Sequence, residues 1–302
     1  KTEWHDFLKS KFNWIDFEYY LYKKEAIIPF AKIGNQRISL PFCEYGGPLI
    51  LKEKISFKEF NKDIKEFKDI EIKIHPKINI SIDQPPQKTK PEMITYMLDL
   101  KGKNKEELLS SFRKTLKHSI RDAKKKDIEI KKCESQKELK KFYDLYVKNL
   151  KHRKTIPYPF FIFSHLYKQP ETEIWIAKYK NKIISGDLFL NYNNIIHYLF
   201  GAIDHKYRNI GSNYLLLWNK LKNEAGKEKV FDFGAAPRKS SLATFKRGWR
   251  GKEYPIIKIK RAHQKMDKKK FLRSANLIRT LWKLIPTPII KRISKKLIKY
   301  RI

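Results

Sequence analysis

The chain has 302 residues, of which 41% are hydrophobic and 14% aromatic, enough to bury a core and to argue against global disorder. No apolar run approaches the roughly 20 residues of a transmembrane helix, and Cys43 and Cys133 fit no zinc or redox spacing, so a reducing cytoplasm is expected. The formal net charge of +36 far exceeds the roughly 2 to 8 that solubility requires; it favours polyanionic partners, although a Lys-rich composition alone would also raise it.

The first hundred residues are predicted to form short strands with one or two helices. Aromatic and β-branched residues favour the strands, and Gly34-Asn35 signals a turn between two of them. Apolar residues at helical spacing predict a helix over residues 56–68. The expected strands cover residues 16–22, 25–32, 36–40, 71–74 and 93–100.

A basic helix is expected next. Asn104 and Glu107 form a capping-box pattern, and an apolar stripe at helical spacing follows, which predicts one long helix. Arg113, Lys117 and Arg121 recur every four residues and therefore project from one face. They are candidates for lining a channel that binds an anionic precursor or the acceptor end of a tRNA; a solvated surface is the alternative interpretation.

The order of elements after residue 128 is the most informative pattern. Ser135 and Glu138 begin a predicted helix, and short polar connections join three strands into an antiparallel meander. The predicted elements are a strand at 128–132, helices at 135–149 and 158–167, strands at 173–179, 182–190 and 194–201, a helix at 209–226, a strand at 229–233, a short helix near Ser241 and a strand at 256–260. This order, β-α-α-β-β-β-α-β-α-β, is that of the GNAT acyltransferase fold, so the expected class is α/β (α+β) and GNAT-like.

The C-terminal residues 263–302 are expected to form a basic amphipathic helical tail. Apolar residues from Phe271 to Ile285 share one helical face, and two prolines separate them from a second segment rich in Lys and Arg. Helices of this kind bind anionic membrane surfaces. A helix packed on the protein body, with a solvated basic face, is the alternative.

Five short motifs together resemble the Fem-like family of acyltransferases, which includes the peptidyltransferases that build peptidoglycan bridges, and the related BioF2-like class. The motifs are Ser39-Leu40-Pro41-Phe42, Tyr45-Gly46-Gly47-Pro48, Ser119-Ile120-Arg121-Asp122-Ala123-Lys124, Phe231-Asp232-Phe233-Gly234 and Phe245-Lys246-Arg247-Gly248-Trp249. Their order and spacing cover most of the chain. The resemblance implies two GNAT-like domains: a degenerate copy at 1–103, a connecting basic helix at 104–127 and a second copy at 128–262, with the cleft between the halves.

The resemblance also implies a reaction. Fem enzymes transfer an amino acid from aminoacyl-tRNA to an amine on a lipid-linked or nucleotide-linked envelope precursor. A cytoplasmic enzyme, peripheral at the inner face of the membrane, is therefore expected. An acyl-coenzyme A donor remains the alternative, and no tightly bound cofactor is expected. A non-catalytic protein that binds nucleic acid or membrane through its charge is the rival from another class.

Direct acyl transfer to an amine needs positioning and oxyanion donors rather than a protein nucleophile, and the sequence contains no G-x-S-x-G or H-E-x-x-H motif. Arg208 and Gly211 match two positions of the R/Q-x-x-G-x-G/A pyrophosphate motif of GNAT enzymes. Asp232, at a predicted strand end, is the candidate that assists the amine. Lys246 and Arg247 are candidates for holding a diphosphate or a carboxylate.

The motif Tyr45-Gly46 is the remaining substrate-binding candidate, because glycine allows the backbone to approach a ligand closely. A purely structural turn is an equal alternative. The histidines His118, His197 and His205 show no metal-ligand spacing, so no metal is expected.

Overall fold

The computed structural model describes residues 2–51, 55–67, 69–77, 80–81, 92–261, 282 and 284–298. The chain divides into two compact units. The first combines the chain up to Ile94 with a return segment that begins at Tyr254. The second holds Thr95–Glu253 together with the C-terminal helix.

The first unit is built on one mixed sheet of strand order β1-β2-β3-β6-β16, with β4 paired to β2. Its helix α2 begins after Ser56, whose side chain accepts a hydrogen bond from the Glu59 N–H. The core is a cluster of buried aliphatic and aromatic side chains that includes Phe30, Phe60 and Ile72. The elements are α1 (Thr2–Lys11), β1 (Asp16–Tyr22), β2 (Ala26–Ile33), β3 (Gln36–Ser39), β4 (Leu49–Ile50), β5 (Ile55–Ser56), α2 (Phe57–Asp63), η1 (Ile64–Glu66), β6 (Ile70–Ile74), β7 (Ile80–Ser81) and β16 (Ile257–Arg261).

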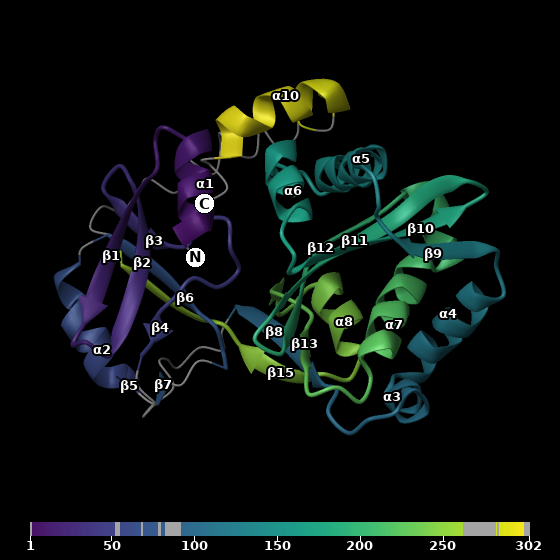
Figure 1. Ribbon diagram of the computed structural model, residues 1–302, viewed down its shortest axis with the longest axis horizontal. Coiled ribbons are helices and arrows are strands. Elements are labelled where there is room, and N and C mark those ends of the chain that lie inside the picture. The colour runs from purple at the N-terminus through teal and green to yellow at the C-terminus, as the bar shows by residue number, and fades with distance from the viewer. Residues whose placement is uncertain are drawn as a thin grey trace. The chain divides into compact units, whose positions relative to one another are not determined.

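The second unit begins with a strand and a series of helices and strands in the order predicted for a GNAT fold. Figure 1 labels most of its elements. They are β8 (Met93–Asp99), α3 (Lys105–Ser111), α4 (Lys114–Lys124), β9 (Ile128–Lys132), α5 (Gln136–His152), α6 (Phe160–Tyr167), β10 (Thr172–Tyr179), β11 (Lys182–Tyr192), β12 (Ile195–Ile203), η2 (His205–Ile210), α7 (Ser212–Glu224), β13 (Val230–Asp232), β14 (Ala236–Pro237), α8 (Ser241–Arg247), β15 (Lys252–Pro255) and α10 (Thr287–Leu297).

The sheet of the second unit has the order β14-β8-β13-β12-β11-β10-β9, with β15 on β8. Strands β9 to β12 pair antiparallel, which confirms the predicted meander. Strand β13 instead pairs parallel to β12, and this pairing covers only Ile195–His197 against Val230–Asp232. Helices α5 and α6 cover one face, and α7 covers the other with α4 packed outside it (Figure 1).

The predicted long basic helix is two helices. The capping box of Asn104 and Glu107 is present and begins α3. Phe112 and Arg113 then have extended backbone angles, so α4 begins anew at Lys114. Phe112 is buried against Trp218 and Trp249, and this contact places the break.

Two further elements differ from the sequence prediction. Helix α1 was not predicted. Strand β16, which the sequence order assigns to the second GNAT-like domain, pairs antiparallel with β6 in the first unit. The guanidinium of Arg261 holds it there by donating to the carbonyl oxygens of Ile64 and Asn61.

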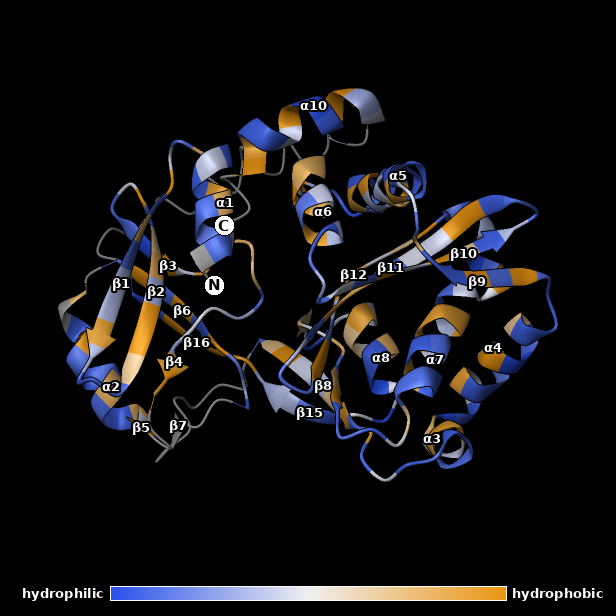
Figure 2. Cartoon of the chain, in the orientation of Figure 1, coloured by the Kyte–Doolittle hydropathy of each residue, from blue (hydrophilic) through white to orange (hydrophobic). Residues whose placement is uncertain are grey.

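Helix α10 packs on α5 through one face. Ile290, Ser294 and Ile298 are fully buried, and Lys291 forms an ion pair with Asp144. Figure 2 shows hydrophobic and hydrophilic residues alternating around this helix. The packing is the alternative that the sequence left open, and a basic face remains exposed. Most of the preceding amphipathic segment predicted from Phe271 lies outside the described residues. No helix within the described ranges is long and apolar enough to span a bilayer.

Candidate active site

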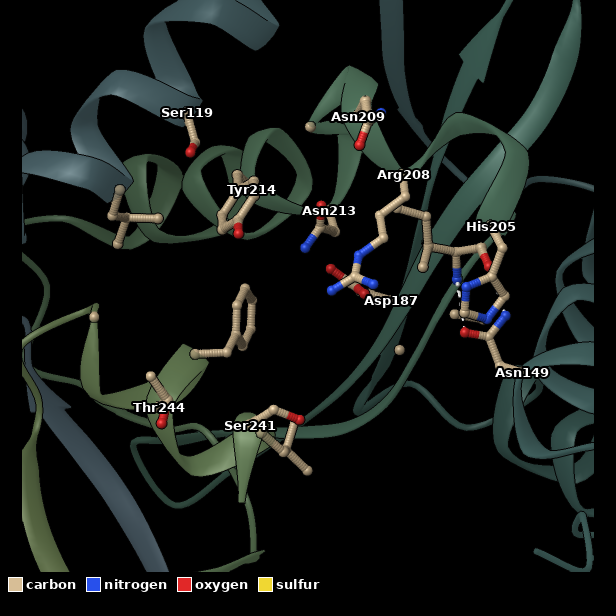
Figure 3. A pocket seen from close by; sticks show the side chains of 18 of the residues that line it. Ser119, Asn149, Asp187, His205, Arg208, Asn209, Asn213, Tyr214, Ser241 and Thr244 are labelled. Carbon is tan, nitrogen blue, oxygen red and sulfur yellow. Dashed lines mark hydrogen bonds between the residues drawn. The ribbon is translucent and has the colours of Figure 1, made fainter. Parts of the chain in front are cut away.

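A cavity of about 980 Å³ opens in the second unit where β12 and β13 diverge. Beyond the paired residues, β12 continues as Tyr198–Ile203 while the chain after β13 turns into β14 and α8. Side chains from α4, the end of α5, β12, η2, the start of α7 and α8 line the space (Figure 3). All lining residues belong to this one unit. The central sheet therefore opens within the second unit itself.

A bulge in β12 shapes the floor of the cavity. The pairing between β11 and β12 shifts by one residue at Leu188 and Phe189, which leaves Leu199 extra. The Tyr198 side chain then lies over Gly201, where an added Cβ would come within 1.8 Å of the Tyr198 hydroxyl. The Tyr198 hydroxyl donates a 2.9 Å hydrogen bond to Asp187 Oδ1. Glycine at 201 thus makes room for the Tyr198–Asp187 pair.

Asp187 is an acid with an unusual environment. It lies on β11, is 2% exposed and points into the cavity (Figure 3). Burial raises its pKa to about 8, and the hydrogen bond from Tyr198 opposes the rise. Among the described residues, no hydrogen-bond partner meets its second oxygen, Oδ2. A buried acceptor without a partner is costly and points to a ligand group.

The N-terminus of α7 forms another wall. Gly211 has a left-handed backbone (φ 82°) that ends η2 and begins α7. Ser185 and Ser212 are buried and hydrogen-bonded at 2.8 Å, which fixes the first turn of α7 against β11. The Lys126 ammonium donates to the carbonyl oxygens of residues 209 and 210. A helix N-terminus with positive side chains beside it attracts anions.

Three of the sequence candidates line the cavity together: Arg113, Arg208 and Gly211. Figure 3 shows Arg208 reaching into the space from η2. Lys117 and Arg121 lie on α4 outside the lining, and Lys117 donates to the Ser110 carbonyl oxygen.

Asp232 lies elsewhere, in a buried network at the end of β13. Its oxygens accept hydrogen bonds from the Thr95 hydroxyl at 2.5 Å and the Gly234 N–H at 2.9 Å, and His197 Nδ1 is 3.0 Å away. Burial alone would raise the pKa of Asp232, but His197, Thr95 and Gly234 together lower it to about 2. The residue is fully buried and is not among the cavity residues.

Lys246 and Arg247 separate, although they are neighbours in the sequence. Lys246 is 4% exposed, and its ammonium donates at 2.9 Å to the carbonyl oxygens of Gly234 and Ala235. Arg247 is exposed at the end of α8. Neither residue is in the cavity lining. Lys246 therefore ties α8 to the turn that follows Asp232.

The motif Tyr45-Gly46 lies in the first unit. A Cβ at Gly46 would come within 2.0 Å of the Ser39 carbonyl oxygen, so glycine is required for the close approach of two backbone segments. The Gly46 N–H donates to the Lys73 carbonyl oxygen. The ring of Tyr45 meets His75 edge-on. These contacts give the motif a structural role in its own unit.

Sequence reasoning missed Asp187, Tyr198 and Lys126. Of the three, Asp187 is the one whose functional role the sequence could have indicated, since it is an acid inside an apolar predicted strand. Tyr198 resembles any aromatic strand residue until the bulge beside it is known. Lys126 is hidden among the consecutive lysines that follow α4.

Comparisons with known proteins agree with this architecture. A family model described as an acetyltransferase (GNAT) domain matches residues 110–247, and one described as the FemAB family matches residues 56–158. None of the curated protein sequences matches the chain. The crystal structure of FemX is 15% identical with a TM-score of 0.57, over 91% of this chain and 93% of that one. L-PGS from Bacillus licheniformis is 15% identical with a TM-score of 0.54, over 92% and 96%.

The match to a GNAT acetyltransferase domain over residues 110–247, together with the opened sheet, indicates an acyltransferase with a GNAT-like fold. At these identities the two solved structures support the fold alone. The family model that begins in the first unit adds a narrower similarity: residues 56–158 match the FemAB family.

Proposed function

We propose that this enzyme transfers an aminoacyl group from aminoacyl-tRNA to an amino group of a lipid-linked or nucleotide-linked precursor of the cell envelope. The match of residues 56–158 to the FemAB family and the similarity to FemX and L-PGS support this choice. The observation that carries it is the cavity in the opened sheet, because its 980 Å³ can hold the acylated end of a large donor beside an acceptor amine.

The positively charged residues of the cavity have a common role in this proposal. Arg208, Arg113 and the N-terminus of α7 at Gly211 bind the phosphates of the substrates. Lys117 and Arg121 extend the positive surface along α4, where a tRNA acceptor end would approach.

The remaining candidates act more indirectly in this proposal. Asp232 and Lys246 position the turn at Gly234 rather than touch the substrate, because both are buried and hydrogen-bonded to it. Arg247, on the exposed end of α8, contacts the part of the donor outside the cavity. Substrate binding by Tyr45 and Gly46 stays a prediction from the sequence, and the contacts of the motif in the first unit are structural.

An acyl-coenzyme A donor is the second candidate. Arg208 in η2 and Gly211 at the N-cap of α7 match two positions of the pyrophosphate motif and both line the cavity, which favours coenzyme A. Asn213 stands where that motif has a small residue, and its side chain points into the cavity (Figure 3). This side chain occupies space that a pyrophosphate would need, so aminoacyl-tRNA remains the first choice.

The test is incubation of the protein with charged tRNA or acyl-coenzyme A and a panel of precursor amines, with products read by mass spectrometry. The variant Arg208→Ala should lose about 10- to 100-fold in kcat/KM, the value of a charge-assisted hydrogen bond. Lys206→Ala, on the exposed side of η2, is the matched control and should stay within about twofold. If Arg208→Ala and Lys206→Ala lowered kcat/KM equally, Arg208 would not be a substrate-binding residue.

We also propose that α10 attaches the enzyme to an anionic membrane surface. Its buried face is used in packing on α5, so the exposed Lys295 and Lys296 in its last turn, with the exposed Leu284 before the helix and Ile289 in its first turn, would make the contact. Each lysine contributes about 1 kcal/mol near an anionic surface. Binding to anionic vesicles should fall more than about tenfold in Lys295→Glu/Lys296→Glu.

The control for this attachment is the pair Lys180→Glu/Lys182→Glu, which removes the same charge from the exposed turn after β10 and the first residue of β11. It should bind the vesicles like the unaltered chain apart from a small loss from net charge. Equal binding of both variants would show that α10 does not make the contact.

A further inference from the structure

Resting on the proposed transfer to an amine, we infer that Asp187 and Tyr198 form the subsite for the acceptor's amino group. The ligand class is a primary ammonium, and Asp187 Oδ2 receives its proton. No sequence motif indicated this pair.

The position of the pair supports the assignment. Asp187 faces the cavity from β11 next to the bulge of β12, at the point where the central sheet opens. Its Oδ1 is fixed by the Tyr198 hydroxyl at 2.9 Å, whereas Oδ2 has no partner among the described residues. A fixed carboxyl group with one open acceptor is suited to receive an N–H donor from a ligand.

The charges of the wall decide which substrate group comes here. The groups around Asp187 that carry or can carry positive charge are His152 and Arg153 at the end of α5, His205 and Arg208 in η2, Arg113 before α4 and Lys126 after it. These cations attract the phosphates and repel an ammonium. Asp122 is the other acid of the lining, and it is paired with His118 on α4. Asp187 is thus the place where a cationic amine finds an open carboxyl oxygen.

The proton and electron changes balance without another reactant. The ammonium gives one proton to Asp187 Oδ2 and becomes a neutral amine. Its nitrogen lone pair forms a bond to the donor's carbonyl carbon, and the bond from that carbon to the leaving oxygen or sulfur breaks. The nitrogen gives its second proton to the leaving group, and Asp187 returns its own proton to water as the products leave.

The environment of Asp187 suits this task. A carboxyl group whose pKa lies near 8 is a stronger base than an ordinary aspartate, and an arriving ammonium favours its ionised form. The Tyr198 hydroxyl stabilises that form, so removing the hydroxyl should raise the pKa of Asp187 further. Tyr198 is thereby a positioning residue for Asp187.

The activity test uses three variants of the full chain. Asp187→Asn should lower kcat/KM about 10²- to 10⁴-fold, the usual contribution of a general base, and leave the KM for the donor unchanged. Tyr198→Phe should move the rising limb of the pH profile of kcat/KM to higher pH, which a merely structural defect would not do. Asp127→Asn, an exposed aspartate after α4, is the matched control and should keep full activity.

A binding test needs no turnover and separates this inference from the proposed function. Calorimetry at pH 7 should show that Nα-acetyl-lysine amide binds the unaltered chain at least about tenfold more tightly than its neutral analogue Nα-acetyl-norleucine amide, and that Asp187→Asn removes the difference. Equal binding of the two probes would overturn the subsite, whatever the transfer assay shows. An absence of transfer from every donor, with the probe preference intact, would overturn the proposed function alone.

A third arm distinguishes the acceptor from the donor's own amino group. If Asp187 binds the acceptor, an N-acetylated aminoacyl-tRNA should lose as much activity in Asp187→Asn as the free aminoacyl-tRNA does. A loss confined to the donor with a free amino group would overturn the assignment to the acceptor.

Discussion

The stability of the Asp187→Asn variant, measured relative to the unaltered chain, should increase as the pH rises. Burial raises the pKa of Asp187 to about 8, against 3.8 for an ordinary aspartate. Between these values the folded chain holds one more proton than the unfolded chain, so its free energy of unfolding falls by about 1.4 kcal/mol per pH unit. Asparagine does not titrate, so the variant lacks this slope.

The difference in unfolding free energy, variant minus unaltered chain, should therefore grow by roughly 2.7 kcal/mol between pH 5 and pH 7. Urea unfolding of both proteins at pH 5, 6, 7 and 8 measures it. The variant should also be the less active protein, since a costly buried group is retained where function requires it. A difference that stays constant over this pH range would refute the raised pKa assigned to the buried Asp187 carboxyl group.

Two further substitutions test the packing that supports the cavity. Lys220→Met should cost about 3 to 5 kcal/mol in urea unfolding, because the buried ammonium lies 3.0 Å from Glu173 and 2.9 Å from Glu224 and its loss leaves both carboxylates without it. Gly201→Ala should cost about 1 to 3 kcal/mol and reduce activity, since the new methyl group displaces the Tyr198 hydroxyl.

Each of these has its own check. Adding Glu224→Leu to Lys220→Met should recover part of the lost stability, because it removes one of the two acids that the Lys220 ammonium contacts; no recovery would argue against the buried pair. For Gly201→Ala, the pH profile should change together with the stability. A fully active Gly201→Ala variant would show that the Tyr198–Asp187 contact is dispensable.

The fold of the second unit could be predicted because its signals are local. Polar two- and three-residue turns fix the meander, and the capping Ser135 fixes the start of α5. The break between α3 and α4 could not be seen, because the residues around Phe112 continue the helical spacing. Burial of that ring against two tryptophans, far away in sequence, decides it.

The candidate site was predictable only where sequence neighbours remain neighbours in space. Arg208 and Gly211 share one turn, and both line the cavity. Lys246 lies at the spacing of a surface cation on α8, but the carbonyl oxygens of the turn after β13 draw its ammonium inside. Asp187 depends on a register shift in the neighbouring strand, and such shifts have no signature in composition or periodicity.

The late arrival of β16 has a consequence for biosynthesis. Strand β6 leaves the ribosome with one edge open, and its partner follows about 180 residues later, which at ~5–20 residues per second takes roughly 10 to 40 s. The second unit, continuous from Thr95 to Glu253 apart from α10, is synthesised entirely within that interval. A nascent chain thus exposes an unpaired β edge while its catalytic half folds, so fragments that end before Ile257 should be prone to edge-to-edge aggregation.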